Sequence, residues 1–237
     1  YPTEVPLTSQ SSVIRDRLLQ GLALRDVALT VWNGKGKPVV THRGDMLFTH
    51  FGLSGPAALR CSQFVVKELQ RSGASTVRLT IDLFPDESGP LLAENLAKLA
   101  AAEPRKTIKN LLKMRLPDRL VPVVLNRAGI GESQLWNEIG KAAREALVAE
   151  MKRFAVNING TLPLEKAFVT GGGVNLKEVD PRTMQSKRMP GLFFCGEILD
   201  IHGYTGGYNI TAAFVTGHCA GRSAAAYARV AADEPAE

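Results

Sequence analysis

A glycine-rich loop near the C-terminal end of the chain holds the residues whose types and spacing point most directly to chemistry. The loop spans residues 203–209, GYTGGYN, and contains Gly206 and Gly207. Glycine lets backbone amides approach a ligand closely, and the small-residue helix expected next turns free N–H groups and a positive dipole end toward it. Shortly upstream, Glu197 follows Gly196 at the end of an apolar run. This pattern predicts a site for a ligand with a polar chain and a flat polar ring.

A second glycine run precedes this loop. The segment Ala167–Gly173, AFVTGGG, passes from a predicted strand into Gly171, Gly172 and Gly173. No side chain there can contribute chemistry, but three adjacent amides can lie against a flat ring without steric hindrance. We therefore assign these glycines to the same predicted ligand site.

The three cysteines favour a reducing compartment. Cys61, Cys195 and Cys219 are far apart, odd in number and without a Cys-x-x-Cys partner, so they indicate neither a disulfide framework nor a metal site. The run Gly191–Cys195, GLFFC, has the length and aromatic content of a buried strand. We therefore expect Cys195 to be a buried strand cysteine rather than a reactive thiol.

Alternating apolar residues predict antiparallel sheet in the first third of the chain. We expect a strand over Leu22–Trp32, a hairpin turn over residues 33–37 and a return strand over Pro38–Thr41. Ser75–Phe84 has the two-residue period of a strand with one buried face. Between these strands, Ser54 is placed as the N-cap of an apolar helix.

The pattern then becomes helical. We expect Ser88 to cap the first helix, Pro104 and Pro117 to begin further helices, and the longest helix to span about Glu132–Lys152. No acid, histidine or metal-ligand pairing occurs in this block, which indicates an inserted helical subdomain. Strand alternation returns over Phe154–Gly160.

These elements predict an α+β protein. An antiparallel β-domain, either barrel-like or a layered sheet, is interrupted by the helical subdomain. The tail past Ala232 is rich in Ala, Asp, Glu and Pro and is expected to fray. The predicted divisions are the first part of the β-domain (1–86), the helical subdomain (87–152), the return strand (153–168) and the C-terminal ligand-binding segment (169–237).

The run GLFFCGEILDIHGYTGGYN, with TGGGVNLKEVDPRTMQSK upstream and MLFTHFGLSGPAAL earlier, resembles a family of bacterial flavoproteins. These are described as NAD(FAD)-utilising dehydrogenases, and include aminoacetone oxidases and bile-acid reductases. The resemblance covers essentially the whole chain. Family members begin with a βαβ unit carrying a GxGxxG turn, and these residues contain no such turn. We therefore expect the chain to be the C-terminal portion of a longer protein, whose N-terminal FAD-binding portion would be its partner.

The resemblance implies that the cofactor is FAD, with NADH or NADPH as a candidate electron donor. It places the carboxylate of Glu197 near the ribityl or pyrophosphate part of FAD. It places the amides of Gly206–Ile210, which include those of Tyr208, Asn209 and Ile210, at the pyrimidine edge of the flavin, where reduction leaves negative charge. The C-terminal strand, loop and helix would then complete a Rossmann-like fold with two dinucleotide-binding domains.

The resemblance thus implies an FAD-dependent oxidoreductase that transfers hydride between flavin and a small organic substrate or nicotinamide. His202, Tyr204 and Tyr208 lie beside the expected ring and could donate protons, but each could equally anchor or pack the loop, so no catalytic residue is assigned. His50 is open to the same two interpretations. The alternative is a non-catalytic ligand-binding or interaction module that keeps the flavoprotein fold.

The composition bears on possible partners. The 237 residues carry a net charge of +6, but their lysines and arginines are scattered and only 6% of residues are aromatic. Nucleic-acid binding usually combines a basic stripe with exposed aromatics, so we expect a small-molecule substrate and no nucleic acid. No apolar run approaches the length of a membrane span, and a cytoplasmic protein is expected.

Overall fold

The computed structural model describes residues 1–233 and divides into two compact units. The sheet unit is Val5–Leu162; the glycine-loop unit combines Tyr1–Glu4 with the chain from Pro163 onward. The chain is α+β with antiparallel sheet, as predicted. The tail past Ala232 lies largely outside the described residues. Within residues 1–233, no helix has the length and apolar character needed to cross a membrane.

The sheet unit is built on seven strands in the order β7-β6-β3-β4-β5-β2-β8, and every neighbouring pair is antiparallel. The sheet is open rather than a closed barrel. Its strands are β2 (Leu7–Thr8), β3 (Ala23–Trp32), β4 (Pro38–Phe48), β5 (Gly52–Ser54), β6 (Val77–Asp82), β7 (Phe154–Ile158) and β8 (Gly160–Thr161), and a short helix, α1 (Ser12–Arg15), follows β2.

The predicted hairpin between β3 and β4 is confirmed. The side chain of Asn33 accepts hydrogen bonds from the amides of Lys35 and Lys37, at 3.0 and 2.9 Å, and so holds the turn. The return strand is longer than predicted, because β4 continues past Thr41 to Phe48. Its second half alternates less clearly and contains Gly44, opposite a register shift in β3.

The helix α2 (Pro56–Ser72) packs on one face of the sheet. Leu29 and Val31 of β3 are fully buried, and the Cys61 thiol of α2 lies 3.8 Å from the Leu29 carbonyl oxygen. The predicted cap at Ser54 is wrong by one residue, since Gly55 occupies that position with φ +91°. A Cβ atom at Gly55 would lie 2.8 Å from the Cα of Met46, so the close approach of β4 requires glycine.

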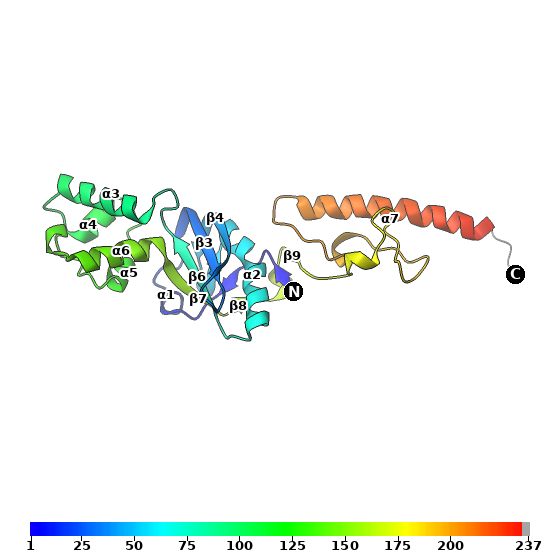
Figure 1. Cartoon of the computed structure of the whole chain (residues 1–237), viewed down its shortest axis with the longest axis horizontal. Helices are drawn as coiled ribbons and strands as arrows, with labels where there is room; N and C mark the ends of the chain where they lie inside the picture. The colour runs from blue at the N-terminus through cyan, green and yellow to red at the C-terminus, as the bar shows by residue number, and fades with distance from the viewer. Residues whose placement is uncertain (234–237) are drawn as a thin grey trace. The chain divides into compact units, whose positions relative to one another are not determined.

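The helical block contains α3 (Gly89–Ala102), α4 (Ile108–Leu112), α5 (Val121–Arg127), a 3₁₀ turn η1 (Trp136–Glu138) and α6 (Lys141–Lys152). Figure 1 shows these helices grouped beyond the strands. Ser88 caps α3 as predicted, accepting from the Leu91 amide at 3.3 Å. The predicted helix from Glu132 is wrong in its first half, because Gly140 is extended (φ −64°, ψ 159°) and separates η1 from α6.

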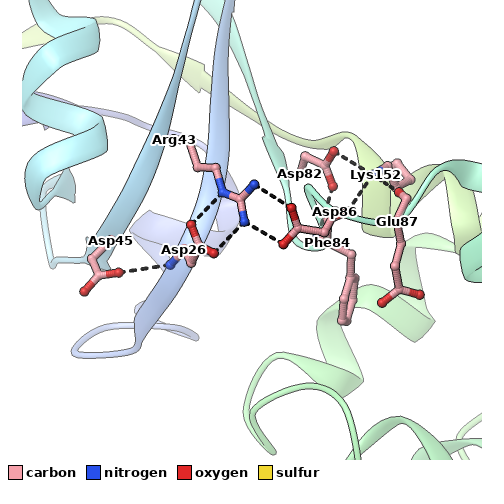
Figure 2. Close-up of polar contacts among 8 residues, drawn as sticks. All are labelled: Asp26, Arg43, Asp45, Asp82, Phe84, Asp86, Glu87 and Lys152. Atoms are coloured by element: carbon pink, nitrogen blue, oxygen red, sulfur yellow. Dashed lines mark hydrogen bonds and ion pairs between the residues drawn. The ribbon is translucent and has the colours of Figure 1, made fainter.

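Two cations tie the block to the sheet (Figure 2). Arg43 of β4 donates to the carboxylates of both Asp26 and Asp86, each at 2.6 Å. The hydrogen bonds from Arg43, aided by its positive charge, lower the pKa of both acids. Lys152, the last residue of α6, pairs with Asp82 at 2.7 Å and donates to the Phe84 carbonyl oxygen at 2.7 Å. The segment that leaves β6 is therefore held from both sides.

The glycine-loop unit has little sheet. Its strands β1 (Pro2–Thr3) and β9 (Val169–Thr170) pair antiparallel, and its largest element is α7 (Tyr208–Asp233). Three 3₁₀ turns are η2 (Leu164–Lys166), η3 (Leu176–Glu178) and η4 (Gly196–Ile198). The buried strand predicted over Gly191–Cys195 is wrong. Its run makes a single bridge, from Phe193 to Gln185, and Cys195 is exposed.

Candidate functional site

The first glycine run lies directly after β9. A Cβ atom at Gly171 would lie 2.6 Å from the Tyr1 ring, and one at Gly173 would lie 2.3 Å from the Ile198 carbonyl oxygen. Both distances are shorter than real contacts, so these two glycines allow segments of the same chain to meet. Gly172, with φ +87°, has more room, since its Cβ would lie 3.7 Å from the nearest Tyr1 atom.

The η4 segment packs alongside this run. Glu197 accepts a hydrogen bond from the Thr170 amide at 2.7 Å, and Asp200 accepts from the Gly172 amide at 3.1 Å. Both residues are exposed. A carboxylate has about four acceptor positions, so Glu197 keeps acceptor capacity for a ligand hydroxyl. The structure thus brings the first glycine run and Glu197 together, and it adds Asp200, which no pattern in the sequence selects.

The second glycine segment joins η4 to α7. Gly206 and Gly207 have φ values of +135° and +91°, which only glycine adopts readily. The Asn209 side chain accepts from the Gly203 amide at 2.7 Å and donates to the Gly203 carbonyl at 3.0 Å. Asn209 therefore links the two ends of the loop. Because the first turn of a helix leaves its amides without intrahelical acceptors, those of Tyr208 and Ile210 mark the anion-attracting end of α7.

A buried acid holds the same loop from its other side. Glu4 is only 2% exposed, has φ +50°, and accepts from the Thr205 amide at 3.2 Å through its carboxylate. A non-glycine residue at positive φ is strained and persists only where its surroundings fix it. The position between two prolines gave no signal of this role. Glu4 thus belongs to the structure that positions the glycine loop.

The predicted residues also meet around a small cavity. Gly196, Glu197 and Asn209 line it together with Thr216 of α7, whose hydroxyl accepts from the Gly196 amide at 3.0 Å. Its volume is about 10 Å³, which is room for one water molecule rather than a ring. A flat ring that contacted these residues would therefore have to lie outside this cavity, against a second wall.

The start of α7 is unusually apolar on its exposed surface. Ile210 and Phe214 are 65% and 75% exposed, and Tyr208 is 69% exposed. Of 17 exposed large apolar side chains within the described residues, 13 belong to the glycine-loop unit, which has fewer residues than the sheet unit. Several exposed apolar side chains in the same part of a protein are typical of a face that another segment covers.

The side chains considered for acid–base chemistry differ in burial and in the residues that they contact. His202 has 15% of its side chain exposed, and its Nδ1 lies 3.8 Å from Asp200 Oδ1. Its ring packs edge-on against Tyr1 at 5.9 Å. Tyr208 projects into solvent, and His50 contacts Phe51 in the sheet unit. Across residues 1–233, no group of three His, Cys, Asp or Glu side chains is placed to hold a metal.

Comparison with known proteins identifies relatives of two kinds. The chain is 34% identical over 206 residues to a protein named ribosomal RNA dihydrouridine synthase from Escherichia coli, and 31% identical over 205 residues to one of the same name from Haemophilus influenzae. Each alignment covers 86% of this chain and 47% of the relative. A 3-dehydro-bile acid delta(4,6)-reductase from Clostridium scindens is 31% identical over 182 residues, 77% of this chain and 44% of that protein.

The chain thus spans about half the length of these relatives. The resemblance to a flavoprotein family that includes bile-acid reductases is supported at this coarser level, while no aminoacetone oxidase is among the relatives described here. The family described as "HI0933-like protein barrel and H2TH domain" matches residues 1–169, which include the whole sheet unit. The chain therefore belongs to the HI0933-like family.

Proposed function

We propose that this chain is the substrate-binding and flavin-contacting part of a flavin-dependent oxidoreductase that reduces a carbon–carbon double bond. The observation that carries the proposal is its similarity, over 77–86% of its length, to relatives whose names specify such reductions. The wall formed by Glu197, the glycine loop and the start of α7 supports it independently, because it suits a flat ring that gains negative charge.

The two kinds of relative share one reaction. Forming dihydrouridine saturates the 5,6 double bond of uracil, and a delta(4,6)-reductase acting on a 3-oxo steroid saturates a double bond of a dienone. In each substrate the double bond is conjugated to a carbonyl, so hydride adds to the β-carbon, or to the δ-carbon at the end of a dienone, and a proton then adds to the resulting enolate. We therefore propose a conjugated carbonyl compound as the substrate class.

The residues of the wall have distinct roles in this proposal. Glu197 accepts hydrogen bonds from hydroxyl groups of the flavin side chain while it holds the Thr170 amide. The first-turn amides of α7, from Tyr208 to Ile210, face the ring edge where reduction places negative charge. Flavin supplies the hydride when bound. Asn209 and Glu4 keep the loop in place, so these amides need no rearrangement during the reaction.

The remainder of the flavin site is proposed to come from the part of the relatives' length that this chain does not span. A unit holding the adenosine and pyrophosphate would cover the apolar surface of α7 at Ile210 and Phe214. NADH or NADPH is proposed as the electron donor. Both proposals concern the complete protein.

Two glycines give a matched test in the complete protein. Gly207 and Gly36 both have positive φ, +91° and +72°, and a Cβ atom at either would meet nothing within 4 Å. Gly207→Ala and Gly36→Ala should therefore cost similar stability, about 1 kcal/mol each. Only Gly207→Ala should weaken flavin binding, because Gly36 lies in the β3–β4 turn. Flavin released on dilution, followed by fluorescence, measures the difference.

The reaction itself is tested by anaerobic titration. The purified complete protein should carry flavin, and NADH or NADPH should bleach its absorbance near 450 nm, roughly as free flavins do when reduced. Adding a uridine-containing RNA or a 3-oxo-4-ene steroid should then restore the oxidised spectrum. A complete protein with no flavin absorbance, even after FAD or FMN is added, would contradict the proposal and favour a non-catalytic module.

A further inference from the structure

A large groove lies within the sheet unit and takes no part in the glycine-loop site. It has a volume of about 1020 Å³ and separates the sheet face opposite α2 from helices α3 and α6. Small-molecule sites usually occupy roughly 300–1,000 Å³, so this groove is slightly larger than most of them. Its lining mixes hydroxyl groups, aromatic rings, four cations and the two carboxylates of Asp82 and Glu145.

Hydroxyl groups cross the sheet side of the groove. Thr30 of β3 stands opposite Thr41 of β4 and Thr80 of β6, so the three side chains form a row across neighbouring strands. The Oγ1 atoms of Thr30 and Thr41 are 2.8 Å apart, and the Trp32 indole donates to Thr80 Oγ1 at 2.8 Å. Thr80 is only 3% exposed, so Thr30 and Thr41 are the members of the row whose hydroxyls, as donors and acceptors, can meet the polar edge of a ring.

The α3 side of the groove is made of small residues, whereas α6 also contributes the long side chains of Lys141, Arg144 and Lys152. Gly89, Pro90, Ala93 and Ala97 of α3 line it, as does Ala149 of α6. None of these side chains reaches far from its helix. A flat ring can therefore enter between the helices and the sheet.

Both tryptophans of the chain line this groove, and each has an arginine beside its ring. The Arg144 guanidinium lies 4.7 Å from the centre of the Trp136 ring and donates to the Trp136 carbonyl at 2.7 Å. The Arg153 guanidinium lies 6.0 Å from the Trp32 ring. Indole and guanidinium planes are surfaces on which nucleobases stack.

The charge of the groove is positive. Lys152 is already neutralised by Asp82 at 2.7 Å (Figure 2), but within residues 1–233 no carboxylate pairs with Arg144 or Arg153. The whole sheet unit carries 22 Lys and Arg against 14 Asp and Glu, a net charge of +8, whereas the glycine-loop unit carries 7 against 9. The basic excess of the protein is therefore concentrated in the unit that holds the groove.

We propose that this groove binds a single-stranded segment of RNA. Bases stack on Trp32 and Trp136, two threonines of the row meet base edges, and Arg144 and Arg153 hold phosphates. This inference rests on the proposed function, because it identifies RNA as the substrate whose double bond the flavin would reduce. The scattered basic residues of the sequence led us to expect no nucleic acid, but folding gathers two arginines and both tryptophans into one groove. A bile acid carries one carboxylate and could engage only one of these cations, whereas each nucleotide of an RNA strand brings a phosphate.

The test measures binding of a labelled oligouridine RNA of about 12 nucleotides to the complete protein by fluorescence anisotropy at several salt concentrations. Arg153→Gln should weaken binding several-fold and lower the salt slope by about 0.7, the value for one phosphate contact on a single strand. Lys67→Gln is the matched control, because it removes the same charge from α2 on the opposite sheet face. Trp136→Ala should weaken binding roughly 5- to 100-fold, and Trp136→Phe less.

Each result decides the inference. Three outcomes would each overturn it. The wild type and the groove variants bind RNA equally, Lys67→Gln and Arg153→Gln lose the same affinity, or the protein binds a 3-oxo-4-ene steroid but no RNA. Unfolding midpoints from circular dichroism show whether Trp136→Ala remains folded. If it does not, the comparison of Arg153→Gln with Lys67→Gln still tests the inference. RNA binding without bound flavin would overturn the proposed reduction alone, and bound flavin without RNA binding would overturn the groove assignment alone.

Discussion

Glu87 lies where the chain leaves the sheet and enters the helical block, and it joins α3 to the segment after α4. Only 17% of its side chain is exposed, and its carboxylate accepts from Arg115 and, at 2.7 Å, from Asn95. The hydrogen bond from Arg115, aided by that from Asn95, lowers the pKa of Glu87 below its usual range. Arg115 in turn lies 4.7 Å from the Phe84 ring, so losing the carboxylate leaves a partly desolvated cation.

We predict that Glu87→Gln lowers the free energy of unfolding by about 2 kcal/mol at pH 7. Because the folded pKa is below the unfolded one, this stabilisation is present above the unfolded pKa and is lost as the pH falls through the folded pKa. The difference between variant and wild type should therefore shrink at pH values below about 4. Urea unfolding across this pH range measures it.

Glu94→Gln supplies the control for that experiment. Glu94 pairs with Lys98 at 2.6 Å, but both side chains are well exposed in an i,i+4 arrangement on α3. Exposed pairs contribute little, so the urea midpoint should hardly move at any pH. An equal loss in both variants would show that Glu87 contributes no more than a surface charge.

At the scale of elements, helix α5 ends in a motif that its sequence encodes. Gly129 has φ +70°, its amide donates to the Asn126 carbonyl, and the Ile130 amide donates to the Leu125 carbonyl. This is the Schellman pattern, which favours glycine at its left-handed position. Gly140, before α6, has φ −64°, which any residue adopts.

These two glycines separate backbone conformation from packing, because a Cβ atom at either would meet nothing within 4 Å. Gly129→Ala should destabilise the protein by about 1 kcal/mol. Gly140 is the N-cap of α6, where alanine caps less well than glycine, so this loss offsets the entropy gain from the unfolded chain and Gly140→Ala should be close to neutral. Thermal unfolding of the two variants compares them directly. Equal effects would mean that the φ value at position 129 does not limit the choice of residue.

The elements also show which predictions a sequence supports. Strands with one buried face, such as β3 and β6, follow from their alternation, and α3 follows from its Ser88 cap. The run Gly191–Cys195 failed because its apolar residues do not enter a sheet. Phe193 packs edge-on against Tyr227 of α7 instead, at 6.2 Å. Local hydrophobicity indicates that a segment packs, but not against what.

The candidate sites differ in the same way. The glycine segments and Glu197 are close in sequence, so their pattern is visible before folding. Glu4 reaches Thr205 from the opposite end of the chain, and the groove joins Trp32 to Trp136, so both depend on long-range contacts that no local pattern encodes. Side chains that act on another segment are therefore the ones that sequence reasoning misses.

For the molecule as a whole, the uneven distribution of apolar surface predicts where the remaining length of the protein packs. Phe214 on α7 is 75% exposed in the glycine-loop unit, and Met114 is 54% exposed in the sheet unit. If the proposed adenosine-binding portion covers α7, Phe214 is buried in the complete protein while Met114 stays in water. Placing a charge at the first position then removes apolar burial and desolvates a carboxylate, whereas at the second it does neither.

We therefore predict that Phe214→Asp destabilises the complete protein by about 2–3 kcal/mol and speeds flavin release, while Met114→Asp changes neither property. Thermal unfolding and flavin fluorescence measure the two effects on the same samples. The exposed fractions in this structure alone would predict the opposite order of stability, with Phe214→Asp tolerated better than Met114→Asp, because the more exposed position should accept a charge more easily. A harmless Phe214→Asp would show that this face of α7 remains in solvent and that the flavin site is completed elsewhere.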